Sequence, residues 1–305
     1  MPRLCKPRVL ILVALAALLI ALAAAGQYQR LFERTWFHLI QTFGEPPPQS
    51  LGLPDYRAVI QAKPIDGLPA DVSALTFDPQ RRSLFTVTNK RSELVELSLD
   101  GTLLRRIALR GFGDPEAVEY IRPGLFVITD EGASRLLAVR IDDATTGLDA
   151  ADAEQLVLNL GEPGNRGFEG LAYDPARARL YVAKEQRPML IYEISGFPRA
   201  GGPTSAIEIS QNRQRDAGLF VRDLSSLLFD KRNGHLLALS DESRLLVELD
   251  GNDKPIGTLS LRRGNHGLER TVPQAEGIAL DDQGTLYLVS EPNLFYVFKK
   301  PEPGA

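Results

Sequence analysis

Residues 168–185 read FEGLAYDPARARLYVAKE. Two short apolar runs, rich in Leu, Tyr, Val and Ala, flank a turn that begins with Asp174 and Pro175. Runs this short, bounded by turn residues, are typical of β-strands rather than of helices. The stretch therefore predicts an antiparallel hairpin with an acid near each of its ends, Glu169 at the start and Glu185 at the close.

The same hairpin pattern occurs five times along the chain. The copies read VSALTFDPQRRSLFTVTN from Val72, PEAVEYIRPGLFVITD from Pro115, FEGLAYDPARARLYVAKE from Phe168, LSSLLFDKRNGHLLALSD from Leu224 and AEGIALDDQGTLYLVSE from Ala275. A third apolar run follows every copy, and a fourth follows all but the last. Four short strands repeated at a spacing of roughly 40–50 residues indicate a β-propeller, in which each repeat is one blade.

The last copy lacks a fourth strand because the chain ends. DYRAVIQAKP, residues 55–64, has strand character and no other partner, so we expect it to complete this blade. The prediction is an all-β propeller of five four-stranded blades over residues 55–300, closed by its N-terminal strand. A sixth, divergent blade is the alternative, but the spare segments TTGLDAADAEQ and RQRDAGLFVRD have the composition of loops.

Residues 1–43 have the composition of a membrane anchor or signal segment. Three basic residues precede the uncharged run VLILVALAALLIALAAA, residues 9–25. This order places the N-terminus in the cytoplasm and the rest of the chain across a bacterial inner membrane. A retained single-pass helix is one interpretation, and cleavage after the small residues Ala23 and Ala25 is the other; both put the main domain in the periplasm. Residues 44–54 form a Pro-rich linker, and residues 301–305 form a tail.

Composition excludes several classes of function. Hydrophobic content of 44% and charged content of 24% fit a folded domain, and a net charge of −4 argues against nucleic acid as a partner. Cys5 is the only cysteine, so neither an internal disulfide nor a cysteine metal site is expected. The three histidines lie far apart in sequence, which argues against zinc.

The hairpin ends carry an unusual run of acids. In a propeller the first strand of each blade lines the channel, so both ends of every hairpin fall at one mouth of that channel. The first ends carry Ser73, Glu116, Glu169, Ser225 and Glu276, and the second ends carry Asn89, Asp130, Glu185, Asp241 and Glu291. Seven of these ten side chains are carboxylates and none is basic.

Carboxylates crowded at a narrow mouth repel one another unless a cation lies among them. Oxygen ligands without Cys or His favour a hard ion, and the breadth of the ring favours Ca²⁺ over Mg²⁺. The candidate calcium ligands are therefore Glu116, Asp130, Glu169, Glu185, Asp241, Glu276 and Glu291. The alternative is a structural ring of hydrogen bonds, in which acids such as Asp130 and Asp241 cap backbone N–H groups in turns.

Four of the repeated phrases follow the pattern of one bacterial family: VITDE at 127–131, FEGLAYD at 168–174, LSDES at 239–243 and AEGIALD at 275–281. Over residues 55–300 the chain resembles the SdiA-regulated (YjiK-like) membrane-anchored proteins. The resemblance implies a β-propeller whose channel is able to hold calcium, with no settled activity. The Glu-Gly element is also similar, more distantly, to that of phytase-like calcium-dependent propellers. Ser73 and Ser225 depart from this pattern, which favours three glutamates on one arc over a full ring.

Two functions compete at this point. The first is a binding or interaction module at the membrane, whose small-molecule or protein ligand meets the calcium-bearing face. The second is a calcium-dependent hydrolase of phosphoesters or lactones, in which the ion polarises a substrate oxygen. His266, in the loop before the fifth copy, is the candidate base for the second function, whereas His235 lies at the far turn of its hairpin. No nucleophile motif or dinucleotide fingerprint identifies a catalytic residue.

Overall fold

The computed structural model describes residues 7–28, 30–43, 49–68, 70–158, 167–186, 188–199 and 206–301. The chain forms two compact units, residues 1–46 and residues 47–305. The predicted linker residues 44–48 and tail residues 302–305 lie outside the described part of the chain.

The first unit consists of two helices, α1 (Pro7–Tyr28) and α2 (Leu31–Phe43). Within α1 the segment Ile11–Tyr28 has a mean hydropathy of 2.2 and is not buried by other parts of the chain. Its length and composition are sufficient to cross a membrane, and a signal sequence near an N-terminus has the same properties. The structure therefore agrees with both interpretations of this segment.

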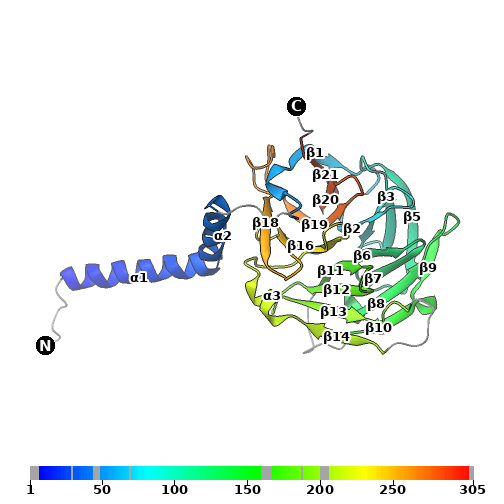
Figure 1. The fold of residues 1–305 in the computed structure, drawn as a ribbon, viewed down its shortest axis with the longest axis horizontal. Coiled ribbons are helices and arrows are strands. Elements are labelled where there is room, and N and C mark those ends of the chain that lie inside the picture. The colour runs from blue at the N-terminus through cyan, green and yellow to red at the C-terminus, as the bar shows by residue number, and fades with distance from the viewer. Residues whose placement is uncertain are drawn as a thin grey trace. The chain divides into compact units, whose positions relative to one another are not determined.

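The second unit is built from five antiparallel sheets arranged around a common centre (Figure 1). Counted outward from the centre, the first blade contains β2 (Val72–Asp78), β3 (Ser83–Thr88), β4 (Glu93–Leu97) and β5 (Leu103–Arg110). The second contains β6 (Pro115–Arg122), β7 (Leu125–Asp130), β8 (Arg135–Arg140) and β10 (Glu154–Val157). The third contains β11 (Phe168–Asp174), β12 (Arg179–Lys184), β13 (Leu190–Ser195) and β14 (Glu208–Gln211).

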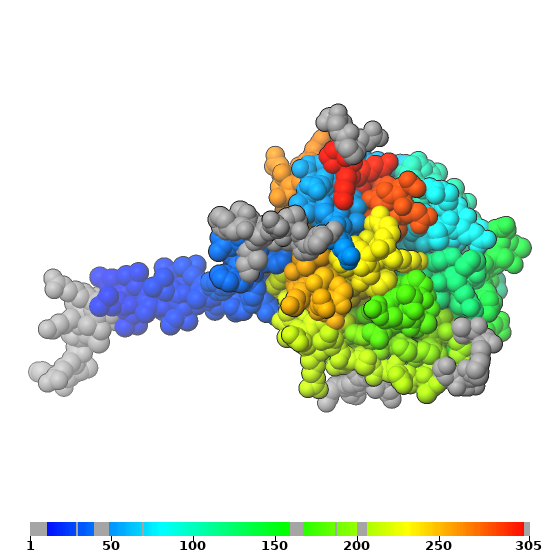
Figure 2. Space-filling view, in the orientation of Figure 1, coloured from blue at the N-terminus to red at the C-terminus, as the bar shows by residue number. Residues whose placement is uncertain are grey.

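The last two blades close the ring. The fourth blade contains β15 (Ser226–Asp230), β16 (His235–Ser240), β17 (Leu245–Leu249) and β18 (Pro255–Ser260). The fifth contains β19 (Gln274–Leu280), β20 (Leu286–Glu291), β21 (Leu294–Lys299) and β1 (Arg57–Pro64). Strand β1 pairs antiparallel with β21, so the N-terminal strand completes the last blade as predicted. In Figure 2 the blue segment that contains β1 lies beside the red C-terminal segment where the ring closes.

Two segments expected to be loops have regular structure. Residues 147–149 form β9 (Gly147–Asp149), which pairs parallel with β5 as a fifth strand at the edge of the first sheet. Residues 213–218 form α3 (Arg213–Gly218), whose first turn is capped by the Asn212 side chain accepting from the backbone N–H of Gln214 and Arg215. Neither segment adds a blade, so the five-blade prediction is confirmed and the sixth blade is not found among the described residues.

The acid that ends the inner strand in four blades is a structural residue. Asp78, Asp174, Asp230 and Asp281 are all buried. Each accepts a hydrogen bond from the backbone N–H two residues later, at 2.8–3.1 Å. Such a bond fixes the turn between the first two strands of a blade. This role explains why the phrase recurs with Asp at this place.

A buried cluster attaches the segment before β1 to the fourth blade. Glu248 on β17 accepts from the backbone N–H of Leu51 at 2.6 Å and from the Ser50 hydroxyl at 2.9 Å. His235 contacts the same carboxylate through Nδ1 at 2.8 Å. Leu51 and Leu53 are buried in the apolar core next to the fourth and fifth blades. The part of the predicted linker nearest β1 therefore packs on the propeller.

The inner strands contact one another in a closed ring, with β19 against β2, β2 against β6, and so on round to β15 and β19. Glycine permits the closest approach. A Cβ atom on Gly277 would lie 2.2 Å from the backbone carbonyl carbon of Ala74, and one on Gly170 would lie 2.9 Å from the backbone nitrogen of Leu227. The Gly that follows each Glu in the Glu-Gly phrases is therefore needed for the packing of neighbouring blades.

We expect Gly277→Ala to destabilise the propeller, because the added methyl group collides with backbone that has no room to move. Overpacking of this kind costs roughly 1–3 kcal/mol, or a fall in Tm of several °C, measured by thermal unfolding of the full chain. Gly251→Ala is the matched control, since no atom lies within 4 Å of its added Cβ. Equal melting temperatures for the two variants would contradict the close contact.

Candidate metal centre

Three glutamates lie at irregular points of the inner strands. In β6, β11 and β19 the pairing with the next strand shifts between Pro115 and Val118, between Phe168 and Gly170, and between Ala275 and Gly277. Glu116, Glu169 and Glu276 fall in these β-bulges, and we call them the hub glutamates. A bulge changes the direction of a side chain relative to the regular alternation of a strand.

The pKa values show that the hub glutamates interact across blades. Burial raises the pKa of Glu169 to about 10, with further contributions from Glu185, Glu276 and Glu116. Burial also raises the pKa of Glu276 to about 8, and Glu116 is again among the acids that add to the effect. The pKa of Glu116 rises to about 7, mainly through burial. Three blades thus contribute acids that interact electrostatically at one mouth of the channel.

Glu116 also belongs to a compact cluster of three acids. Carboxylate oxygens of Asp114, Glu116 and Glu131 all lie within 4.8 Å of one another. Glu116 Oε1 also accepts a hydrogen bond from Asn89 Nδ2 at 3.0 Å, and Glu131 Oε1 accepts from the backbone N–H of Gly167 at 2.9 Å. Oxygen atoms at this spacing suit a hard divalent ion, which takes several carboxylates at once.

Two of the predicted second-end acids belong to the same mouth. Burial raises the pKa of Glu185, with Asp223 as the next cause, and Glu185 shares a hydrogen bond with Glu169. The pKa of Glu291 is raised by burial and by Asp71, while Lys90 opposes the shift. Both side chains stand beside the hub glutamates and are available as further oxygen donors.

The other two second-end acids are engaged in structural contacts. Asp130 is fully buried, pairs with Arg135 at 2.8–2.9 Å and accepts from the backbone N–H of Gly113 and Asp114. Asp241 accepts from the backbone N–H of Ala275 at 2.8 Å and pairs with Arg244. These contacts favour the turn-acid interpretation of both residues over a role as ligands.

Three acids at this mouth were not predicted from the repeat. Asp71, Asp114 and Asp223 each lie one residue ahead of a repeat copy, in the first, second and fourth blades. Asp223 is buried, accepts from the Ser240 hydroxyl and the backbone N–H of Glu242, and has a pKa raised by burial. The signal in the sequence is an Asp one residue ahead of the repeated phrase, outside the residues that define the repeat.

Neither propeller histidine lies at this mouth. His235 is buried at the far turn of its hairpin, as predicted, where it contacts Glu248. His266 packs against the outer edge of β1, with Nδ1 3.0 Å from the backbone oxygen of Tyr56 and its own backbone oxygen bonded to the N–H of Ala58. Because β1 is the outermost strand of its blade, His266 is separated from the channel, and the structure gives no support to its role as a base.

The donor set fits a metal ion that prefers oxygen. The described residues at the mouth offer carboxylates and the amides of Asn89 and Gln186, and Lys90 pairs with Asp71 beside them. The two serines that replace Glu are already bonded: Ser73 bonds to Glu116, and the Ser225 hydroxyl donates to the Ala275 carbonyl at 2.8 Å. This arrangement is able to hold a hard cation and to present it to an oxygen-bearing ligand.

Comparison with known proteins gives a match to one sequence family and, among solved structures, distant similarity to chains such as the two described below. A sequence model of the SdiA-regulated family matches residues 48–299. A chain of the crystal structure of a nidogen/laminin complex is 18% identical with a TM-score of 0.46, over 73% of each chain. A luciferin-regenerating enzyme is 9% identical with a TM-score of 0.46, over 79% of this chain and 94% of that one.

The raised pKa values predict that the metal-free protein becomes less stable as pH rises. The folded hub glutamates keep protons that the unfolded chain, with an ordinary pKa of 4.5, has already released. The protonated hub glutamates therefore contribute fully to the free energy of unfolding below about pH 4.5. This contribution is lost as pH rises towards 7–10. In chelator we expect Tm to fall by at least roughly 2–4 °C between pH 6 and pH 9, equivalent to about 1 kcal/mol.

Glu169→Gln removes one of these titrating groups and should flatten the pH dependence measured by thermal unfolding. Glu269→Gln, at an exposed position outside the mouth, should leave it unchanged. A parent chain whose Tm stays constant over this range would show that the hub carboxylates are not desolvated.

Proposed function

The chain belongs to the SdiA-regulated family, and for this member we propose a binding module that faces the periplasm from the inner membrane and holds Ca²⁺ at the acidic mouth of its propeller. The ligand of the module is a small molecule or protein that meets this face. The hub glutamates, with Asp114 and Glu131 beside Glu116, are the proposed ligands of the ion, and Glu185 and Glu291 are further oxygen donors at the same mouth.

The convergence of the hub glutamates is the observation that supports the proposal most. Three carboxylates from three blades are half-buried at one mouth of the channel. Glu276 and Glu116 add to the raised pKa of Glu169, and Glu116 adds to that of Glu276. Burial of like charges without compensation is costly, and a divalent cation offsets that cost while it replaces the bound protons. The bound ion would also link the second, third and fifth blades and supply a fixed positive charge for an oxygen of the ligand.

A rigid ring with its loops at one face suits binding more than catalysis. Loops carried by a rigid scaffold commonly make the specific contacts, and the fold itself does not determine the ligand. The hydrolase alternative needs a general base near the ion, and neither His235 nor His266, the histidines of the propeller, lies there. Four basic residues lie near the acidic positions in sequence and would be needed for a phosphate substrate. Lys90 pairs with Asp71 at the mouth, Lys184 is buried, and Arg166 and Arg187 lie outside the described part of the chain.

The location in the membrane rests on the first unit. The segment Ile11–Tyr28 is long and apolar enough to span, and the preceding basic residues favour a cytoplasmic N-terminus. With a retained helix the propeller follows on the periplasmic side, where calcium has access to it.

We expect Ca²⁺ to raise the Tm of the full chain in detergent relative to chelator. At a concentration one hundred times Kd the stabilisation is about 2.7 kcal/mol, which corresponds to roughly 5–10 °C. Mg²⁺ should have a smaller effect, because it demands a smaller octahedral site. Affinity measured by calorimetry should rise between pH 6 and pH 9, since binding releases protons.

Glu169→Gln should weaken calcium binding by at least roughly 10–100-fold. This is the loss of affinity that follows when a residue supporting a metal ligand is removed, and a ligand itself should matter at least as much. Glu208→Gln, an exposed acid on the outermost strand β14, is the control and should bind normally. A Tm that is the same in calcium and in chelator would refute the calcium site. Calcium-dependent turnover of a chromogenic phosphoester or lactone would favour the hydrolase instead.

A retained anchor predicts that the mature protein keeps its N-terminal segment. Mass spectrometry of the chain from the membrane fraction should find the full 33.5 kDa product, released by detergent but not by high salt or carbonate. Protease added to spheroplasts should degrade the propeller. A soluble product that begins after Ala25 would establish cleavage, and would leave the calcium proposal unaffected.

A further inference from the structure

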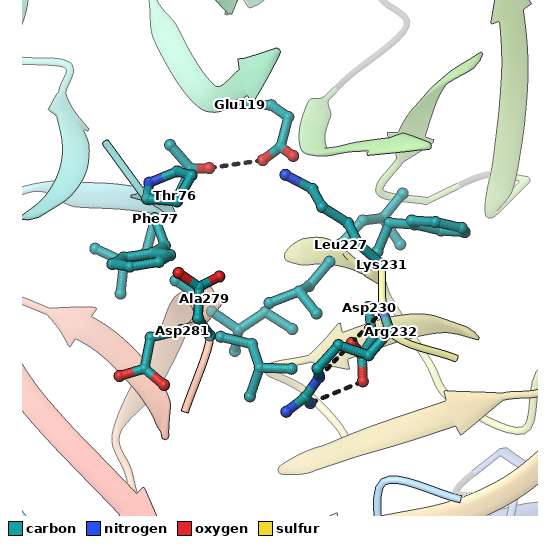
Figure 3. Close-up of a pocket in the computed structure, with 16 residues that line it drawn as sticks. Thr76, Phe77, Glu119, Leu227, Asp230, Lys231, Arg232, Ala279 and Asp281 are labelled. Atoms are coloured by element: carbon teal, nitrogen blue, oxygen red, sulfur yellow. Dashed lines mark hydrogen bonds and ion pairs between the residues drawn. The ribbon is translucent and has the colours of Figure 1, made fainter. Parts of the chain in front are cut away.

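The opposite mouth of the channel contains a separate cavity of about 120 Å³ (Figure 3). It is lined by the later halves of the inner strands and by the turns that follow them, and on β6 its residue Glu119 lies three positions after the hub glutamate Glu116. Four blades contribute to its lining, through β2, β6, β15 and β19 and the turns that follow β15 and β19. Apolar side chains such as Leu75, Leu227 and Ile278 form part of its wall.

Two opposite charges face this cavity. Glu119 on β6 is half-buried and accepts a hydrogen bond from the Thr76 hydroxyl at 2.8 Å. Lys231, in the turn after β15, extends towards the Glu119 carboxylate, and the two do not form an ion pair (Figure 3). The ammonium of Lys231 lies 5.3 Å from the centroid of the Tyr120 ring and donates no hydrogen bond to another described residue.

The other buried charges of the cavity are already engaged. Asp230 pairs with Arg232 through two contacts of 2.9 Å. Asp281 accepts from the Tyr287 hydroxyl at 2.8 Å and from backbone N–H groups of its own turn. Asp282 is exposed at the rim. Glu119 and the exposed Lys231 are the remaining opposite charges, and their side chains point toward each other at one edge of the cavity (Figure 3).

We propose that this cavity is a second ligand site, which takes a small zwitterion of the α-amino-acid class. The ligand ammonium meets Glu119, and its carboxylate meets Lys231. The Glu119 carboxylate stands beside apolar walls, where electrostatic contacts are stronger than in water, whereas Lys231 is exposed at the rim. Burial raises the pKa of Glu119 to about 7, and a ligand cation would favour its ionised form as Lys231 does.

The size of the cavity limits the ligand. A protein cavity of about 150 Å³ accommodates benzene, so 120 Å³ suits a molecule of roughly five or six non-hydrogen atoms. Glycine and alanine fall in this range. A larger side chain would have to extend through the open side of the cavity into solvent.

The test is calorimetry on the full chain in detergent with chelator present, so that the acidic mouth does not contribute. The probes are L-alanine, propionate, which lacks the amine, and isopropylamine, which lacks the carboxylate. We expect L-alanine to bind at least about tenfold more tightly than either analogue, a difference of about 1.4 kcal/mol. Lys231→Met should weaken L-alanine binding by a similar factor.

Lys254→Met is the matched control, because Lys254 is an exposed lysine in another turn of the same blade. It should bind L-alanine normally. Glu119→Gln, which keeps an acceptor for Thr76, should lose the preference for L-alanine over propionate. Equal binding of propionate and L-alanine by the parent chain, no binding of any probe, or normal binding by Lys231→Met would each overturn the proposal. None of these outcomes bears on calcium binding at the other mouth.

Discussion

The close approach of neighbouring inner strands is the constraint on which the rest of the propeller depends. Five strands can close a narrow ring only if their backbones come near contact, and Gly170 and Gly277 make this possible where β11 meets β15 and where β19 meets β2. The same irregular points of β11 and β19 carry Glu169 and Glu276. The residues that let the ring close thus stand next to the residues that give its mouth a negative charge.

The fold was predictable because its information is local and repeated. Short apolar runs, turn residues and a strand without a partner were enough to predict five blades and the closure by β1. The misassigned segments are those with irregular or unrepeated sequence. Gly147–Asp149 pairs as an edge strand only because β5 offers a free edge, and α3 depends on a single capping residue, Asn212.

The candidate site was only partly predictable, because its members meet through closure of the ring. The hub glutamates belong to the repeated phrase, whereas Asp114 and Asp223 lie just before it. These two acids come close to the other carboxylates of the mouth only in the assembled propeller. The position of Asp130 in the repeat also did not distinguish it, as a structural acid, from the acids at the second ends of the other hairpins. Its role follows from contact with Arg135 in the same blade, a pairing that the repeat does not encode.

The attachment of the segment before β1 has a mechanical consequence. Any pull on the N-terminal end of the chain is transmitted along the backbone to Ser50 and Leu51 before it reaches the closing strand β1. Glu248 holds both residues through buried hydrogen bonds, and it belongs to the fourth blade rather than to the fifth. The force would therefore act on the fourth blade as well as on the fifth. The contacts of Glu248 would have to break before the force reached the pairing of β1 with β21, which closes the ring.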